Sequence, residues 1–153
     1  TYESFTEDEL PKLWTAFERA DRIIGYNSDG FDFPVLEKYY PGDVRKFPSL
    51  DLMREIEKHL GFRVKLVDVA KATLGVGKNG DCLKAVEYFR TGDMQKLRDY
   101  CLQDVKVTKE LYEFGCDHKK LFYVDRIGKR LEIPVDFRLK MQKGAAMNMT
   151  IGL

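Results

Sequence analysis

Apolar residues near the start of the chain recur at the spacing of one helix face. Thr6 and Glu9 form a capping box ahead of them, with Thr6 as the N-cap and Glu9 reaching back. The apolar positions that follow are Leu10, Leu13, Trp14 and Phe17. Their three- and four-residue spacing predicts an amphipathic helix that begins just after Glu9.

The rest of the chain alternates short apolar runs with helical stretches. Helices are predicted at 31–40, 51–60, 67–74, 83–90 and 93–114. Strands are predicted at 23–26, 48–52, 121–124 and 131–135, the last two as a hairpin around 125–129. Gly61 and Gly115 occupy positions typical of helix ends. The mixture predicts one α/β domain over residues 1–139 and a loosely ordered tail over 140–153.

Composition and charge change this picture little. Hydrophobic residues make up 44% and charged residues 33% of the 153 positions, and the formal net charge is +1. These are ordinary globular values, and the total charge neither indicates nor excludes a local basic groove. No apolar run approaches the roughly 20 residues of a membrane span. The scattered cysteines Cys82, Cys101 and Cys116 favour a reducing compartment, so a cytoplasmic location is expected.

One carboxylate stands out on the longest predicted helix. The positions that recur there every three or four residues are Leu97, Tyr100, Cys101, Asp104, Val105, Thr108, Leu111 and Tyr112. Asp104 falls in the middle of this stripe, which we expect to face inward. Burying an unpaired charge costs several kcal/mol, so Asp104 needs a cation, either a metal ion or a Lys or Arg at the rim. Tyr100 projects toward the same point from one turn earlier.

A second carboxylate, Asp32, lies between two phenylalanines just after the predicted strand at 23–26. It fits an N-cap, because it directly precedes Phe33 and Pro34 at the start of a predicted helix. It also fits a site residue, since a helix start beside a strand end is a common place for such residues in α/β folds. The residue pattern leaves both roles open.

Two short motifs carry a family resemblance. Asn27 followed by Phe31-Asp32, and Tyr100 followed three residues later by Asp104, resemble the second and third motifs of the DnaQ-like (DEDD-type) 3′-to-5′ exonucleases, in their tyrosine subclass. Their order, with helices between them, is similar to the family's, and the resemblance covers roughly residues 10–137. It implies an α/β, RNase H-like fold whose sheet, partial or truncated in this chain, is flanked by helices and followed by a C-terminal β-hairpin.

The resemblance implies a metal-dependent nuclease acting on a single-stranded DNA or RNA 3′ end, with an attached or partner helicase as a further expectation. In the family, four carboxylates bind two Mg²⁺ or Mn²⁺ ions. Asp32 would help to hold the second ion, Asp104 would hold the first, and Tyr100 would position the attacking water. Asn27 and Phe31 would contact substrate. Two ions about 4 Å apart suit phosphodiester hydrolysis, because they activate the water and stabilise the leaving oxygen.

The chain departs from the family at the first motif. An Asp-x-Glu on the first strand should precede Asp32, and Glu7-Asp8-Glu9 does not match it because it lies in a helix cap. Half of the metal ligands and the strands that carry them are therefore missing. The start at Thr1 favours a chain that lacks an N-terminal stretch over a degenerate homologue. A non-catalytic RNase H-like module for docking or nucleic-acid binding is the alternative function.

A glycine-rich segment at residues 75–80 connects two predicted helices. Its glycines match a dinucleotide-binding pattern, but such a pattern must follow a strand and open a βαβ unit. We interpret the segment as a loop between helices, in which Lys78 approaches a substrate phosphate.

Overall fold

The computed structural model describes residues 1–77 and 82–138, so Lys78 and the predicted tail at 140–153 lie outside the described residues. The α-helices are α1 (Leu10–Arg19), α2 (Asp32–Leu36), α3 (Leu52–Leu60), α4 (Leu66–Leu74), α5 (Cys82–Thr91) and α6 (Met94–His118). The strands are β1 (Ile23–Gly25), β2 (Ser49–Asp51), β3 (Lys120–Val124) and β4 (Arg130–Pro134). Two 3-10 turns complete the order, η1 (Glu7–Glu9) and η2 (Val44–Lys46).

The first helix begins as the capping box predicts. The Glu9 carboxylate accepts a hydrogen bond of 3.2 Å from the Thr6 backbone N–H, which satisfies one of the free donors of a helix start. The box caps η1, which runs directly into α1. Trp14 is buried on the inner face of α1 and meets the rings of Phe17 and Tyr40 edge-to-face. This aromatic cluster joins α1 to the segment that follows α2.

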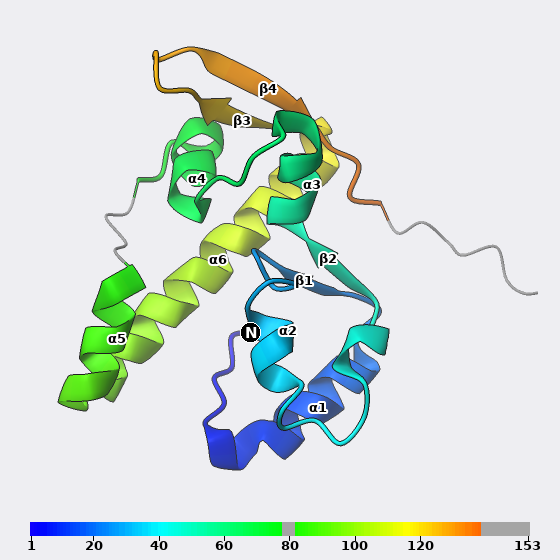
Figure 1. Cartoon of the computed structure of the whole chain (residues 1–153), viewed down its shortest axis with the longest axis vertical. Helices are drawn as coiled ribbons and strands as arrows, with labels where there is room; N and C mark the ends of the chain where they lie inside the picture. The colour runs from blue at the N-terminus through cyan, green and yellow to red at the C-terminus, as the bar shows by residue number, and fades with distance from the viewer. Residues whose placement is uncertain (78–81, 139–153) are drawn as a thin grey trace, which may run out of the picture.

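The strands form two small sheets on opposite sides of the long helix α6 (Figure 1). β1 and β2 pair in parallel, with Gly25 opposite Asp51, so the chain segments that follow both strands start at the same edge. β3 and β4 pair antiparallel as the predicted C-terminal hairpin, with Leu121 opposite Ile133. α4 packs on β3, while α6 contacts β1, β3 and α4. The molecule is therefore an α/β fold organised around α6.

The main core lies between α3, α4, the C-terminal half of α6 and the hairpin. Its fully buried members come from distant parts of the sequence: Leu52, Ile56, Val69, Leu111, Leu121, Ile133 and Phe137. Burying side chains of this size stabilises a fold by about 1.5–3 kcal/mol each before entropy is counted. α3 is placed by its ends, with Asp51 as N-cap and Gly61 as a left-handed C-cap at φ 78°.

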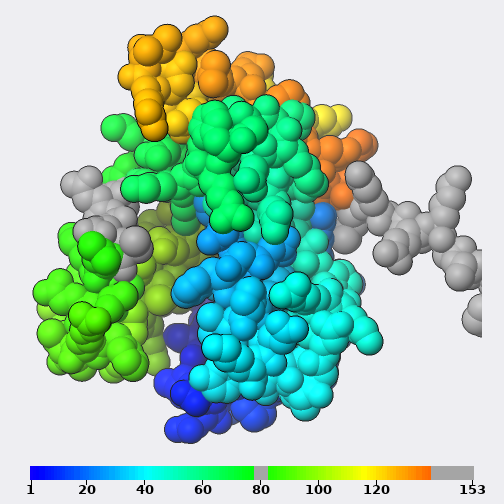
Figure 2. Space-filling model, viewed as in Figure 1, coloured from blue at the N-terminus to red at the C-terminus, as the bar shows by residue number. Residues whose placement is uncertain are grey.

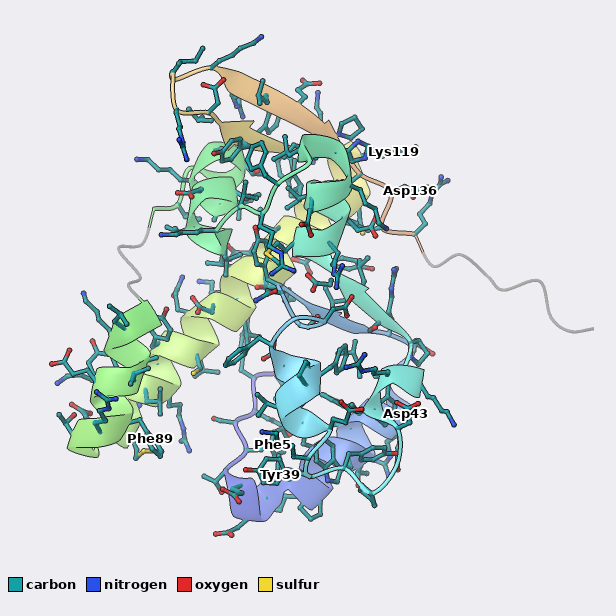
Figure 3. The ribbon with its side chains drawn as sticks, in the orientation of Figure 1. Phe5, Tyr39, Asp43, Phe89, Lys119 and Asp136 are labelled. Atoms are coloured by element: carbon teal, nitrogen blue, oxygen red, sulfur yellow. The ribbon has the colours of Figure 1, made fainter. Side chains whose placement is uncertain are left out.

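Two predicted helix ends were wrong. The helix predicted at 31–40 stops at Leu36, and the one predicted to end at 114 continues to His118. Gly115 is not a helix end, because α6 continues beyond it to His118, and a Cβ at Gly115 would lie 2.2 Å from Cε2 of Phe137. It is a packing glycine that lets Phe137 approach the α6 backbone. Lys119 ends the helix instead, in the left-handed region at φ 56° (Figure 3).

The inward stripe predicted for α6 is correct only in its C-terminal half. Val107, Thr108 and Leu111 are buried, but Asp104 and its neighbour Val105 are exposed. The prediction that Asp104 sits inside an apolar core is therefore wrong. The physical reason is that α6 leaves the main body toward its N-terminus, where α5 is its packing partner, so its apolar spacing there does not translate into burial.

α5 and the first half of α6 form an arm that projects from the molecule (Figure 2). Its outer surface carries several exposed apolar side chains: Leu83, Val86, Phe89, Met94 and Val105. Within residues 1–77 and 82–138, no helix has both the length and the apolar character needed to cross a membrane.

Candidate active site

The turn after β1 is shaped by close packing of small residues. Asn27 adopts a left-handed backbone conformation at φ 61°. A Cβ at Gly25 would lie 2.6 Å from the Ser28 Cβ, and a Cβ at Gly30 would lie 2.6 Å from the Asn27 Oδ1. A Cβ at Gly25 would collide with the Cβ of Ser28, so Gly25 is needed for the turn to close, whereas a Cβ at Gly30 would require the Asn27 side chain to move. The turn thereby directs the following residues, Phe31 and Asp32, into α2.

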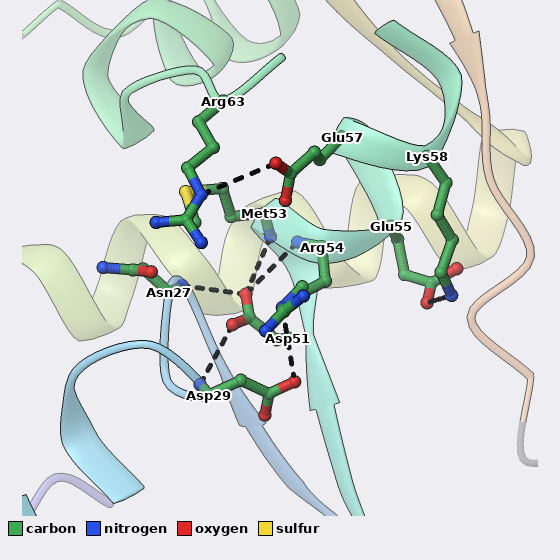
Figure 4. Close-up of polar contacts among 9 residues, drawn as sticks. All are labelled: Asn27, Asp29, Asp51, Met53, Arg54, Glu55, Glu57, Lys58 and Arg63. Carbon is green, nitrogen blue, oxygen red and sulfur yellow. Dashed lines mark hydrogen bonds and ion pairs between the residues drawn. The ribbon is translucent and has the colours of Figure 1, made fainter. Parts of the chain in front are cut away.

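The buried Asp51 carboxylate fixes this turn against β2 and α3 (Figure 4). One oxygen accepts from the Asn27 N–H at 2.8 Å and the other from the Asp29 N–H at 3.0 Å. The first oxygen also accepts from the N–H groups of Met53 at 3.0 Å and Arg54 at 3.4 Å, which caps α3. Such charge-assisted bonds are roughly twice as strong as neutral ones. Asp51 therefore makes the turn, β2 and α3 one rigid unit.

Asp32 occupies the first position of α2, with Phe31 as the N-cap residue. Because Phe31 occupies the N-cap position and Asp32 is the first helical residue, the N-cap role considered for Asp32 from the sequence is wrong. Partial desolvation of the carboxyl group raises the pKa of Asp32; a backbone hydrogen bond lowers it, and the neighbouring Asp51 carboxylate raises it further. Within the described part of the chain, Asp32 makes no ion pair with Lys, Arg or His. Asp32 thus has an acidic neighbour and no ion-pair partner among the described residues, although its side chain is exposed to solvent.

Two buried polar atoms of the turn have no hydrogen-bond partner within residues 1–77 and 82–138. Asn27 Oδ1 accepts no hydrogen bond there, and Ser28 Oγ neither donates nor accepts one. Buried polar atoms almost always form hydrogen bonds, so two such atoms without a partner are a reason to expect a ligand or water beside them. Phe31, by contrast, is 64% exposed and leaves its ring open to a partner.

Tyr100 and Asp104 lie one turn apart in the N-terminal half of α6. Tyr100 is half-buried and Asp104 is exposed. Partial burial raises the pKa of the adjacent Cys101 thiol, and the Asp104 carboxylate raises it further. The two acidic motifs thus belong to elements that pack on each other, since α6 contacts β1 and the Asp32 turn directly follows β1.

A complete metal site is not formed by the described residues. Across 1–77 and 82–138, no group of three or more His, Cys, Asp or Glu side chains is placed to hold a metal ion. Asp32 is available as a ligand, but both carboxylate oxygens of Asp51 already accept hydrogen bonds from backbone N–H groups. The residues present therefore do not fit the two-ion site that the sequence motifs imply.

The family assignment rests on a match that covers most of the chain. A family model described as RNase_H superfamily matches residues 2–115, from before α1 into the last turn of α6. The chain belongs to the RNase H superfamily. No curated protein and no solved structure matches it.

Membership in the RNase H superfamily gives the chain a nuclease-like or nucleic-acid-related function. Nucleases with this fold generally use Mg²⁺ or Mn²⁺. The match includes both acidic motifs and ends before the hairpin at Lys120–Pro134. The hairpin is therefore an addition to the part that defines the superfamily in this chain.

Sequence reasoning gave Asp51 no role, although its position contained the signal. An Asp directly ahead of the predicted helix at 51–60 is a typical N-cap. What the sequence did not reveal is that the same carboxylate also accepts from two N–H groups of the Asn27 turn. That pairing depends on the parallel register of β1 and β2, which places Gly25 opposite Asp51.

Proposed function

We propose that this chain is the part of a metal-dependent 3′-to-5′ exonuclease that contributes the second and third acidic motifs, and that it acts on single-stranded DNA or RNA. Asp32 and Asp104 are proposed as metal ligands and Tyr100 as the residue that positions water. Asn27, Phe31 and Lys78 are proposed to contact the substrate. The ligands still needed for two ions would come from outside the described residues.

The observation that carries the proposal is the state of Asp32. Its carboxylate follows the C-terminal end of a parallel strand, on a turn made rigid by Asp51, and its pKa is raised by desolvation and by that second acid. Asp32 is exposed, so this shift costs the fold little, but residues with perturbed pKa values concentrate at functional sites. A divalent ion would relieve this repulsion and is what hard carboxylate oxygens prefer.

The test uses the protein that carries this chain, a 5′-labelled single strand and Mg²⁺ or Mn²⁺. We expect stepwise shortening that stops when the metal is chelated. Asp32→Asn and Asp104→Asn should each lower the rate by more than about 100-fold, because even changes in residues behind the metal ligands cost 10- to 100-fold.

Asp117→Asn provides the matched control, because it makes the same chemical change at an exposed position of the same helix. It should retain the parental rate. An unshortened strand, or equal shortening by Asp104→Asn and the parent, would reject the exonuclease.

A non-catalytic nucleic-acid-binding module is the second candidate. It is favoured by the lack of an acidic cluster among residues 1–77 and 82–138. Calorimetric titration of this chain with Mn²⁺ separates the two functions. Micromolar binding that Asp32→Asn abolishes would count against the module, whereas no heat at millimolar Mn²⁺ together with tight binding of a single strand would support it.

A further inference from the structure

A groove lies between the hairpin and the segment that joins α3 to α4. It has a volume of about 660 Å³, and residues 62–65, 123 and 125–127 form most of its lining. None of the acidic motifs contributes to it. We propose that this groove binds single-stranded nucleic acid, with bases stacked on its aromatic rings and phosphates on its cations.

Aromatic rings form one wall of the groove. Phe62 is 47% exposed and packs edge-to-face on Tyr123, with ring centroids 5.8 Å apart. Tyr123 holds the two rings in place, because its own ring packs against the hydrophobic core. One face of Phe62 is consequently available on a supported ring. Ring faces of this kind are the stacking platforms that hold unpaired bases without selecting sequence.

Cations surround these rings. Arg63, Lys65 and Arg126 line the groove, and in the described residues only Arg63 has an acidic partner, Glu57 at 3.5 Å. Of the acids in the lining, Asp125 is occupied by the hairpin turn, where it accepts from the N–H groups of Ile127 and Lys129. The remaining acid of the lining is Asp68. Lys65 and Arg126, which have no acidic partner among the described residues, are therefore the cations of the groove that are placed to contact phosphates.

The hairpin turn adds an apolar tip to the groove. Ile127 is 87% exposed between Arg126 and Gly128, and the left-handed Gly128 at φ 82° allows the tight turn. An apolar side chain that stays this exposed buries little surface and therefore contributes little to the stability of the fold. Nucleic-acid-binding proteins use such side chains as wedges between neighbouring bases. Arg130 strengthens the base of the hairpin, because its guanidinium lies 3.7 Å from the centroid of the Phe122 ring.

The groove is connected to the candidate active site. The Tyr26 hydroxyl donates to the Val64 carbonyl at 2.9 Å, and Val64 lines the groove while Tyr26 directly precedes Asn27. Arg63 extends from the same loop toward the Asn27 turn (Figure 4). The loop that lines the groove is thus in contact with the segment that leads into the Asn27 turn. The inference rests on the proposed nucleic-acid function and assigns a second contact surface to it.

The test measures binding of a fluorescent single-stranded oligonucleotide by anisotropy, with EDTA present so that cleavage plays no part. Phe62→Ala should weaken binding by about 5- to 150-fold, the range expected for loss of one stacked base. Phe62→Tyr, which keeps an aromatic ring, should bind the oligonucleotide like the parent. Arg126→Ala should lower the slope of log K against log salt by about 0.7, the value for one phosphate of a single strand.

Matched controls lie far from the groove. Phe89→Ala removes an aromatic ring that is 67% exposed at the far end of α5 (Figure 3). Arg19→Ala removes one exposed arginine from the end of α1. Both should bind like the parent. Ile127→Ser tests the wedge at a position where the fold is not at risk, and it should also weaken binding.

Each result has a defined meaning. Equal binding by Phe62→Ala, Ile127→Ser and both controls would overturn the groove, even if metal-dependent cleavage persists. Cleavage that fails while groove variants still lose affinity would reject the exonuclease and leave the groove intact. Competition by duplex as strong as by single strand, or displacement by polyglutamate at equal charge, would replace the proposed occupant with a duplex or an acidic peptide.

Discussion

The two halves of α6 share one helix but not one environment. In the C-terminal half, Leu111 is fully buried and Gly115 lies against the ring of Phe137. In the N-terminal half, Asp104 is exposed and Val105 is 55% exposed, with α5 as the packing partner. The same apolar spacing therefore produces core in one half and surface in the other.

This difference separates positions that hold the fold from positions free to carry chemistry. The C-terminal half contacts β3 and α4, and any change there must be absorbed by a close-packed interior. Tyr100 and Asp104 lie in the N-terminal half, where Tyr100 is half-buried and Asp104 is exposed. A helix anchored at one end can present functional groups at the other without straining the core, as sites on rigid elements require.

The largest effect should come from shortening a core side chain in the anchored half. Leu111→Ala removes a fully buried side chain and should lower the free energy of unfolding by about 2–5 kcal/mol. Val105→Ala on the same helix should change it by no more than about 0.5 kcal/mol. Urea unfolding followed by circular dichroism measures both. Similar losses for the two variants would mean that the halves do not differ as described.

Next in size is the loss of the Asp51 carboxylate. Asp51→Ala leaves the N–H groups of Asn27, Asp29 and Met53 without their acceptor, so we expect a loss of about 2–3 kcal/mol. Asp43→Ala is the matched control, because Asp43 caps η2 through one bond to the Arg45 N–H and is exposed. It should cost about 1 kcal/mol at most. Equal costs would show that Asp51 is only a helix cap.

Gly115 gives a smaller effect whose sign is informative. Alanine normally stabilises a helix interior relative to glycine by about 1 kcal/mol. Here its Cβ would collide with the buried Phe137 ring, and overpacking costs about 1–3 kcal/mol. We expect Gly115→Ala to be destabilising by about 1 kcal/mol in urea unfolding. In combination with Phe137→Leu the penalty should shrink, and a stabilising Gly115→Ala would contradict the packing role.

The sequence predicted the elements well and their environments less well. The capping box at Thr6, the N-cap position of Asp51 and the hairpin strands were predictable, because they depend on residues close in sequence. Gly115 was misread as a helix end because its contact, Phe137, comes from beyond the hairpin. The exposure of Asp104 was missed because it too depends on which distant segments pack on the helix. Periodicity gives the apolar face of a helix but not which part of that face finds a partner.

The candidate site followed the same rule. Asn27, Phe31 and Asp32 fall in one turn, as their short spacing in the sequence predicts. The doubled role of Asp51 depends on the parallel pairing of β1 with β2 and was not visible in the sequence. The roles of Asp32, Tyr100 and Asp104 in metal binding stay predictions that the assays above test. The cytoplasmic location also stays a prediction.

The smallest expected effect concerns Asp32 and depends on pH. Its pKa is raised in the folded protein, so the folded state holds the proton more tightly and loses stability as pH rises from the unfolded value, about 3.9, through the folded one. Asp32→Asn removes that penalty. The variant should therefore be slightly more stable than the parent at pH 7, by no more than about 0.5 kcal/mol because the residue is exposed. The difference should disappear below about pH 3.9.

Urea midpoints of the two proteins between pH 3 and pH 7 measure this difference. A gain in stability at pH 7 together with loss of cleavage would mark Asp32 as a residue retained for function at a cost to the fold. A gap that stays constant across the pH range would mean that ionisation of Asp32 does not oppose folding. The electrostatic reason for placing a metal ion at the turn after β1 would then be lost, while the anchored half of α6 would keep its role.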